Sequence, residues 1–344
     1  MLKKILAPLL MLAVSGVFCL VLAEGVVRVA RPQPRLVITP GGLYTPDPPG
    51  LYRLSPGYRG KIFNRVEYSN TIRINNEGLR GPELGPSSEP TTRILVIGDS
   101  FVFGVGVEDD ETFTALLPGH LRQAVGSAEG LNAGIPAFGV PDAESWLRRH
   151  GLALEPDVVV MTIFLGNDLA DAAHVGDEVV IVDGLLAPRA SSKGLKVWLH
   201  RHSHLYVAIK GLLEQPGFKP LRAKLGLAEP WKVRTLREEF GVYSKAVESE
   251  MAAAVAATDE ALAGLAALSA EHEFTLMAML IPSEVQIEPE RWQAGLASLE
   301  LDPREYDPEA PTRVFQRLLE GHGVPTLDLT PVFAEELTRG DDLY

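Results

Sequence analysis

The sequence is poor in cysteine. Among its 344 residues the single cysteine is Cys19, which lies inside an apolar stretch near the N-terminus. One cysteine cannot form an intrachain disulfide, and alone it cannot build a thiolate metal site. Phe18 directly before it is bulkier than the residue that precedes a lipid-modified cysteine in lipoprotein signals. The sequence therefore predicts neither a disulfide-stapled fold nor a lipidated cysteine.

Clustered basic charge is also scarce. The 32 Lys and Arg residues are outnumbered by 45 Asp and Glu residues, which gives a net charge of −13. Binding to phosphate backbones requires clustered Lys and Arg, so we expect no nucleic-acid partner. The acidic residues are spread along the chain, a distribution that favours solubility. Hydrophobic residues make up 46% of the chain, enough for one large domain with an insertion or for two small domains.

A long apolar stretch stands out at the N-terminus. Lys3 and Lys4 precede the apolar run 5–23, whose nineteen residues are long enough, as a helix, to cross the hydrocarbon core of a bilayer. We expect residues 1–31 to form an uncleaved membrane anchor, with the rest of the chain on the extracytoplasmic side. A cleaved secretory signal that ends at Ala23 is the alternative that the sequence leaves open.

Composition divides the remaining chain into three parts. Residues 32–60 are rich in Pro and Gly, and they predict an extended spacer. Residues 61–344 form the predicted main domain, which opens with a small β element at 62–80. Within it, 169–240 interrupts the pattern as an insertion, with a hairpin that turns at 183–184 and a helix near 194–214. The insertion is either a cap over the site or a stabilising surface segment.

Short apolar runs alternate with helical patterns through the main domain. The predicted strands lie at 94–97, up to 131–132, and at 157–165, 274–281 and 324–329. The predicted helices lie at 111–125 with a break near Pro118, and at 141–153, 243–271 and 309–322. This alternation predicts an α/β fold with a parallel sheet and helices on both faces. Ligands of such folds bind beyond the carboxyl ends of the strands.

The strongest chemical signal is Gly98-Asp99-Ser100-Phe101, directly after the predicted strand 94–97. Gly98 permits a tight turn, and Asp99 can accept backbone N–H groups that hold the turn. A serine there becomes a nucleophile only with a base and donors for an oxyanion. Taken alone, the motif is also typical of an ordinary turn.

Two further segments supply candidate donors. Residues 131–139, Leu-Asn-Ala-Gly-Ile-Pro-Ala-Phe-Gly, follow the second strand, and Gly166-Asn167-Asp168 follows the third. Each places small or amide residues at the carboxyl end of a strand. Backbone N–H groups and an asparagine amide are donors that stabilise a tetrahedral oxyanion, so both segments can converge on Ser100.

Together these three segments resemble the first three sequence blocks of the SGNH, or GDSL, hydrolases. The resemblance covers about residues 60–344, and the preceding anchor resembles those of membrane-bound bacterial members. It implies a three-layer α/β/α flavodoxin-like fold that hydrolyses or transfers acyl esters without a metal or organic cofactor. The insertion would be cap-like, and the N-terminal helix would hold the enzyme at the membrane.

The resemblance also implies roles for individual residues. Ser100 matches the nucleophile, and its backbone N–H matches one oxyanion donor. Asn167 matches the asparagine whose amide is a second donor. The glycine of the second block falls at Ala137 by its spacing from Asn132, with Gly134 as the competing match.

The C-terminal part departs from this pattern. The fourth block, Asp-x-x-His, should follow the last strand and a short helix, but the sequence there ends with Asp341-Asp342-Leu343-Tyr344. We therefore expect a fragment of a longer hydrolase that stops before its catalytic histidine. The cluster of His200, His202 and His204 predicts a solvated helix face rather than a metal site, and no other histidine is expected to be the base.

The sequence thus predicts a serine ester hydrolase that acts on an acyl ester outside the cytoplasmic membrane. One alternative is an O-acyltransferase or deacetylase of cell-envelope polysaccharide, since a tether and a cap suit an acylated polymer. A second alternative is a non-catalytic binding module on a degenerate hydrolase fold. The missing histidine favours the binding module, whereas Ser100 and Asn167 favour an enzyme.

Overall fold

The computed structural model describes most of the chain. The described residues are 2–31, 41–48, 51–63, 68–85, 91–172, 179–182, 185–188, 195–213, 218, 221 and 240–339. The chain divides into two compact units, and each is considered by itself. The first contains residues 1–38 with 187–230, and the second contains 39–186 with 231–344.

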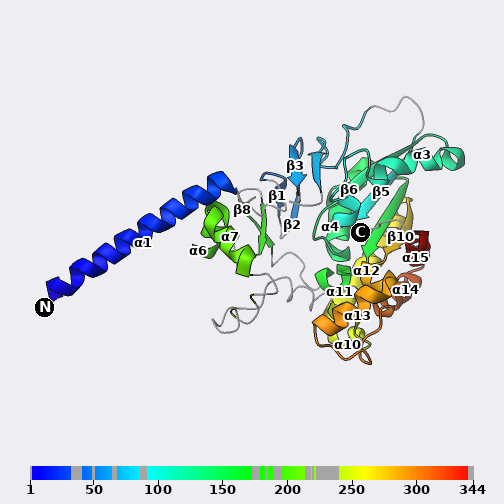
Figure 1. The fold of residues 1–344 in the computed structure, drawn as a ribbon. Helices are drawn as coiled ribbons and strands as arrows, with labels where there is room; N and C mark the ends of the chain where they lie inside the picture. The colour runs from blue at the N-terminus through cyan, green and yellow to red at the C-terminus, as the bar shows by residue number, and fades with distance from the viewer. Residues whose placement is uncertain are drawn as a thin grey trace. The chain divides into compact units, whose positions relative to one another are not determined.

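A five-stranded parallel sheet forms the centre of the second unit (Figure 1). Its strands are β5 (Thr92–Gly98), β6 (Ala128–Gly134), β7 (Val158–Phe164), β10 (Thr275–Ile281) and β11 (Thr326–Asp328). They lie in the order β11-β10-β7-β5-β6, and every neighbouring pair is parallel. Numbered along the chain, this order is 2-1-3-4-5, that of flavodoxin-like folds. The predicted fold class and all five predicted strands are confirmed.

The sheet is covered on both faces, as its continuous apolar runs predict. Side chains alternate along a strand, so Leu95 and Ile97 belong to one core while Ile94 and Val96 belong to another. The first and larger core contains residues of α4 (Val140–Arg149), α11 (Ala252–His272) and α14 (Ala310–Gly321). The second packs under α3 (Phe113–Val125). Strands buried on both faces carry apolar residues at nearly every position. This explains the continuous apolar runs in the sequence.

Several helices differ from their predicted form. The break predicted near Pro118 is wrong, because α3 continues through it while Leu117 and Leu121 pack against the sheet. The predicted helix 243–271 is divided into α10 (Val247–Glu250) and α11. Helices α12 (Glu284–Ile287) and α13 (Pro289–Ser298), which follow β10, were not predicted. The short helix expected after the last strand is present as α15 (Thr330–Arg339). Two 3₁₀ turns lie at Gly151–Leu154 and Gly241–Tyr243.

The second half of the predicted spacer 32–60 is folded instead of extended. Strands β1 (Tyr44–Asp47) and β2 (Leu51–Leu54) pair antiparallel, and Leu43, Tyr44 and Leu54 are buried in the larger core. The Tyr52 hydroxyl donates to the Pro136 carbonyl at 2.8 Å. Apolar residues between the prolines thus pack this segment into the core of the second compact unit. The small β element predicted at 62–80 is present as β3 (Arg59–Phe63) and β4 (Ser69–Arg73).

The predicted N-terminal helix is present as α1 (Leu2–Ala30), which runs without a break through the apolar stretch. In the insertion, β8 (Val179–Val182) pairs with β9 (Leu185–Pro188), while the turn predicted between them lies outside the described residues. The predicted helix near 194–214 is two helices, α6 (Leu195–His202) and α7 (His204–Leu213). The spacer at 32–40 also lies outside the described residues, and the cap role of 169–240 stays a prediction.

Among the described residues, α11 is long and apolar enough to cross a membrane. Its residues Leu262, Leu265 and Leu268 are buried in the larger core, the position of a core helix in a globular domain. Membrane insertion of α1 is a separate prediction.

Candidate active site

Ser100 lies on a tight turn at the carboxyl end of β5. It begins the short helix α2 (Ser100–Phe103), and the Asp99 carboxylate caps this helix by accepting the Phe101 N–H at 2.9 Å. A Cβ at Gly98, where φ is +154°, would lie 2.8 Å from the Thr162 carbonyl oxygen, so only glycine fits there. The turn is therefore pressed against β7. Ser100 is half-buried, and its hydroxyl has one long contact of 3.4 Å with Asp99.

The second predicted segment lies at the end of β6. Its two candidate donors, Gly134 and Ala137, have different surroundings. Gly134 donates its N–H to the Asn132 side chain at 3.1 Å. A Cβ on Gly134 would meet the Phe103 nitrogen at 2.1 Å, so this glycine serves close packing beneath α2. Ala137 is exposed and has a φ of +65°, a left-handed conformation that is uncommon outside glycine. Among the described residues, no acceptor takes the Ala137 N–H.

The third segment follows β7. Asn167 precedes the short helix α5 (Asp168–Asp171), and its amide Nδ2 donates to the Asp171 carboxylate at 2.8 Å. Its amide oxygen is buried without a partner among the described residues. An amide nitrogen carries two hydrogens, so one N–H can bond to Asp171 while the other serves a ligand.

Strand register brings the three segments to one edge of the sheet. Gly98 at the end of β5 pairs with Gly134 at the end of β6, and the Gly98 carbonyl accepts the Ile135 N–H at 2.9 Å. On the other side β5 pairs with β7. The rings of Phe101 and Phe164 stack with centroids 4.1 Å apart, which joins the Ser100 turn to the end of β7. Ser100, Ala137 and Asn167 thus all follow the carboxyl ends of three adjacent strands.

Two buried carboxyl groups lie beneath this edge. Burial raises the pKa of Asp99 to about 6, although hydrogen bonds from Phe101 and Ser100 counteract that rise. Burial also raises the pKa of Asp168 well above its usual range, and the charges of Asp99 and Asp171 raise it further. Asp168 accepts the Phe164 N–H at 2.9 Å. These side chains therefore hold the turns after β5 and β7 in place.

The raised pKa of Asp99 predicts a pH-dependent stability. Between about pH 4 and pH 6 the folded protein retains a proton that the unfolded chain loses, so stability falls as pH rises through this window. Asp99→Asn should remove the Asp99 contribution to this fall, on the order of 2–3 kcal/mol, while Asp142 and Asp168, whose pKa values are also raised by burial, keep their own contributions. Urea unfolding of both proteins at pH 4, 5, 6 and 7.5, followed by tryptophan fluorescence, measures the difference. Parallel stability curves would contradict the prediction.

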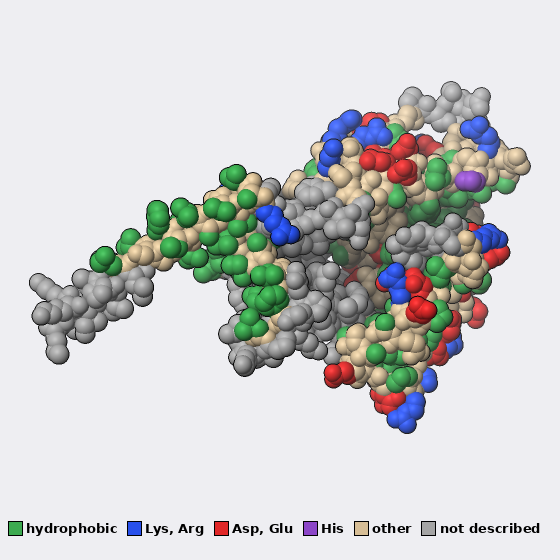
Figure 2. Space-filling view, in the orientation of Figure 1, with side chains coloured by type: hydrophobic (Ala, Val, Ile, Leu, Met, Phe, Trp, Pro, Cys, Tyr) green, Lys and Arg blue, Asp and Glu red, His purple; other side chains and the backbone are tan. Residues whose placement is uncertain are grey.

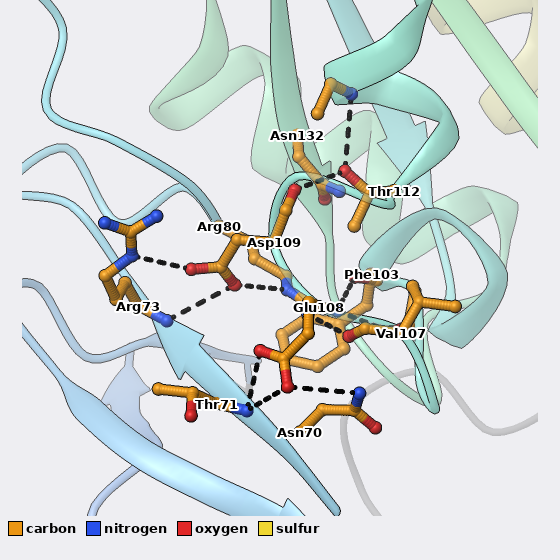
Figure 3. A network of polar contacts seen from close by, with 12 residues as sticks. Asn70, Thr71, Arg73, Arg80, Phe103, Val107, Glu108, Asp109, Thr112 and Asn132 are labelled. Carbon is orange, nitrogen blue, oxygen red and sulfur yellow. Dashed lines mark hydrogen bonds and ion pairs between the residues drawn. The ribbon is translucent and has the colours of Figure 1, made fainter. Parts of the chain in front are cut away.

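A buried arginine that the sequence did not single out braces the loop after Ser100 (Figure 3). Arg80 donates to the Asp109 carboxylate at 3.0 Å and to the Phe103 carbonyl at 2.6 Å. It also donates to the Gly104 and Val107 carbonyls, and its guanidinium lies 5.0 Å from the centre of the Phe103 ring. The backbone carbonyls at the C-terminus of α2, which no further helical turn satisfies, thus accept hydrogen bonds from the buried Arg80 guanidinium.

The β3–β4 hairpin supports the same loop. Asp109 also pairs with Arg73 at 2.8 Å, and the Glu108 carboxylate accepts the Thr71 N–H at 3.0 Å (Figure 3). The Arg80 N–H donates to the Asn132 carbonyl at 3.0 Å, which connects the brace to β6. A buried arginine is unusual, but burial cannot be read from a single Arg-Gly pair, so the sequence carried no distinctive signal for it.

Three of the described histidines have side chains that contact residues other than Ser100. His150 pairs with Asp47 at 2.9 Å and His322 with Asp259 at 2.8 Å, while His202 stacks on Trp198. His174 lies outside the described residues. Within the described part of the chain, no three His, Cys, Asp or Glu side chains form a group that could hold a metal ion.

Comparison with solved structures finds esterases at low similarity. AlinE4, an SGNH-hydrolase family esterase, is 12% identical over 75% of this chain and 88% of its own, with a TM-score of 0.34. Axe2, an acetylxylan esterase from Geobacillus stearothermophilus, is 15% identical over 74% of this chain and 81% of its own, with a TM-score of 0.35. No family model matches the sequence, and no curated protein matches it.

Proposed function

We propose that the protein is a serine hydrolase of the SGNH type that cleaves an acyl ester. The observation that carries the proposal is the convergence at one sheet edge of Ser100, Ala137 and Asn167. Ser100 is a half-buried hydroxyl on a tight turn, Ala137 has an available N–H in a left-handed conformation, and Asn167 has a side-chain amide. A nucleophile beside preorganised donors is the arrangement that acyl transfer requires.

The reaction proceeds in two steps. The Ser100 Oγ attacks the acyl carbonyl carbon and loses its proton to a base, and the carbonyl oxygen becomes an oxyanion. The oxyanion accepts hydrogen bonds from the Ser100 and Ala137 N–H groups and from the Asn167 amide. The alcohol then leaves with a proton, and water hydrolyses the acyl-serine by the same route. Gly134 serves packing in this scheme, because its N–H bonds to Asn132.

The base is the part of the scheme that the described side chains do not supply. The one recorded contact of the Ser100 hydroxyl is with Asp99, at a long 3.4 Å. Asp99 is buried and bonded to the Phe101 N–H, so it serves the turn. The proposed scheme requires such a base, which contributes roughly 10²–10⁴-fold to reactions of this kind.

We further propose that α1 anchors the enzyme in a membrane, with the hydrolase unit on the extracytoplasmic side. Apolar side chains with half or more of their surface exposed extend along this helix (Figure 2), namely Met11, Val14, Val17, Phe18, Leu20, Val21, Leu22, Val26 and Val29. Such a surface is unfavourable in water and favourable in lipid. The substrate is then an acyl ester that reaches the outer side of the membrane, with acylated polysaccharide as one class.

A fluorophosphonate probe tests the proposal, since it forms a bond to an activated serine through an oxyanion-like state. We expect peptide mapping to place the probe on Ser100, and Asn167→Ala to slow labelling by about 10²–10³-fold, the usual effect of losing one oxyanion donor. The exposed Asn76 offers the control substitution Asn76→Ala, which should leave the labelling rate unchanged. No labelling of Ser100 above the rate of the denatured chain would support the binding module instead.

A further inference from the structure

The corner between α6 and α7 is held by two charged residues of α1, within the first compact unit. The Glu24 carboxylate accepts the Ser203 hydroxyl at 2.7 Å and the backbone N–H groups of His204 and Leu205, both at 2.9 Å. These N–H groups lie in the first turn of α7, where no residue of the helix itself can accept their hydrogen bonds. Glu24 therefore caps α7 from another helix.

Arg28, one turn further along α1, completes the clamp. Its guanidinium donates to the carbonyl of His202, the last residue of α6, and pairs with Glu24 at 2.6 Å. A cation at the C-terminus of α6 and an anion at the N-terminus of α7 each complement the local helix dipole. The ion pair of α1 thus fixes both helices at their junction.

Both clamped helices expose large apolar side chains. On α6, Leu195 is 70% exposed and Trp198 is 56% exposed, and on α7, Ile209 is 47% and Leu212 is 48% exposed. Each pair is spaced i, i+3, which places its members on one face of its helix. Hydrophobic side chains continue from α1 over this segment in Figure 2. The apolar surface of α1 therefore extends onto a second element that is joined to it.

The position of the clamp along α1 places this surface at one end of the apolar run. Glu24 directly follows Ala23, the last residue of the apolar run 5–23, so the corner lies where that run ends. In a helix that crosses a bilayer, this is the level of the headgroups. Tryptophan is enriched at that level, and helices with an exposed apolar face lie in the interface plane there.

We propose that α6 and α7 form a membrane-surface element that lies in the interface of the bilayer beside α1. The proposal rests on the membrane insertion of α1 proposed above and is independent of the chemistry at Ser100. The lipid surface covers Leu195, Trp198, Ile209 and Leu212, while Glu24 and Arg28 set the depth of both helices. The anchor is then three helices joined at the interface, of which α1 alone crosses the bilayer.

Site-directed fluorescence on the full chain tests this placement. In a Cys19→Ser background, Leu212→Cys is labelled with an environment-sensitive nitrobenzoxadiazole dye, and the protein is reconstituted into phosphatidylcholine vesicles. We expect blue-shifted emission that is quenched more strongly by a nitroxide near the lipid headgroup than by one near the chain end. Val17→Cys, in the apolar run, should show the reverse order of quenching.

Each other outcome has a definite meaning. Water-like emission at position 212 together with deep quenching at position 17 overturns the surface element and leaves the anchor intact. Absence of lipid quenching at both positions overturns the anchor as well. A blue shift at position 212 without lipid quenching indicates that a protein surface covers α7, which also overturns the proposal.

A second variant tests the clamp itself. Glu24→Ala removes the cap of α7, so we expect the headgroup quenching at position 212 to fall while the quenching at position 17 stays the same. Glu250→Ala, an exposed glutamate at the end of α10, is the matched control and should change neither signal. Unchanged quenching at position 212 in Glu24→Ala would show that Glu24 does not hold the element at the membrane.

Discussion

Ser100→Ala is expected to reduce the hydrolysis of a short-chain aryl ester to the rate in buffer alone. In the proposed reaction the oxygen removed is the one that forms the acyl bond, and no neighbouring hydroxyl can replace it on the turn Gly98-Asp99-Ser100-Phe101. Loss of the nucleophile in a serine hydrolase costs about 10⁶-fold when the catalytic groups act as a unit. The expected loss is therefore the whole rate above background.

The experiment needs two comparisons. Ser298→Ala removes an exposed hydroxyl on α13 and should leave the rate unchanged. The circular dichroism spectrum of Ser100→Ala should match that of the wild type, because the Ser100 hydroxyl makes one long contact. An unchanged esterase rate in Ser100→Ala would refute the assignment of the nucleophile.

Arg80→Met should destabilise the second compact unit by about 3–5 kcal/mol, the cost of breaking a buried ion pair by removing one partner. The Arg80 side chain is 1% exposed, and its loss removes a donor from the buried Phe103 carbonyl and from the partly buried Gly104 and Val107 carbonyls. Buried acceptors that lose a partner bear their full desolvation penalty. Methionine keeps most of the volume, so the cost reflects the lost polar contacts.

The neighbouring arginine provides the control. Arg73 pairs with the same Asp109, but its side chain is 46% exposed, so Arg73→Met should cost less than about 1 kcal/mol. Urea unfolding of the three proteins measures the difference. Arg80→Met should also slow the labelling of Ser100, since Arg80 holds the loop that follows α2. Equal destabilisation by the two substitutions would contradict a special role for the buried arginine.

The contacts of Arg80, Arg73 and Thr71 with the loop after α2 give the small β element a structural role that its sequence did not indicate. The hairpin β3–β4 and Arg80 converge on Asp109 and Glu108, in the loop after α2. The turn that carries Ser100 is therefore fixed on one side by the sheet and on the other by ion pairs. Preorganisation of this kind keeps a nucleophile and its oxyanion donors in register.

The sequence by itself determined the strands and the site segments. Buried parallel strands are apolar at nearly every position, so 94–97, 157–165 and 274–281 were recognisable from local residues alone. Ser100 and Asn167 were singled out because each follows such a strand, and their proposed roles came from the resemblance to SGNH hydrolases. The sequence also marked the apolar run that becomes α1.

Other features depended on contacts between distant segments, which local patterns do not encode. Pro118 was expected to end a helix, yet packing of α3 against the sheet carries the helix through it. Residues 44–54 looked like spacer because of their prolines, yet their apolar side chains are buried in the core. The proposal of Ala137 rather than Gly134 as an oxyanion donor rests on a backbone angle and on close packing beneath α2. The clamp of Glu24 on α7 joins residues about 180 positions apart, and only the folded chain brings them together.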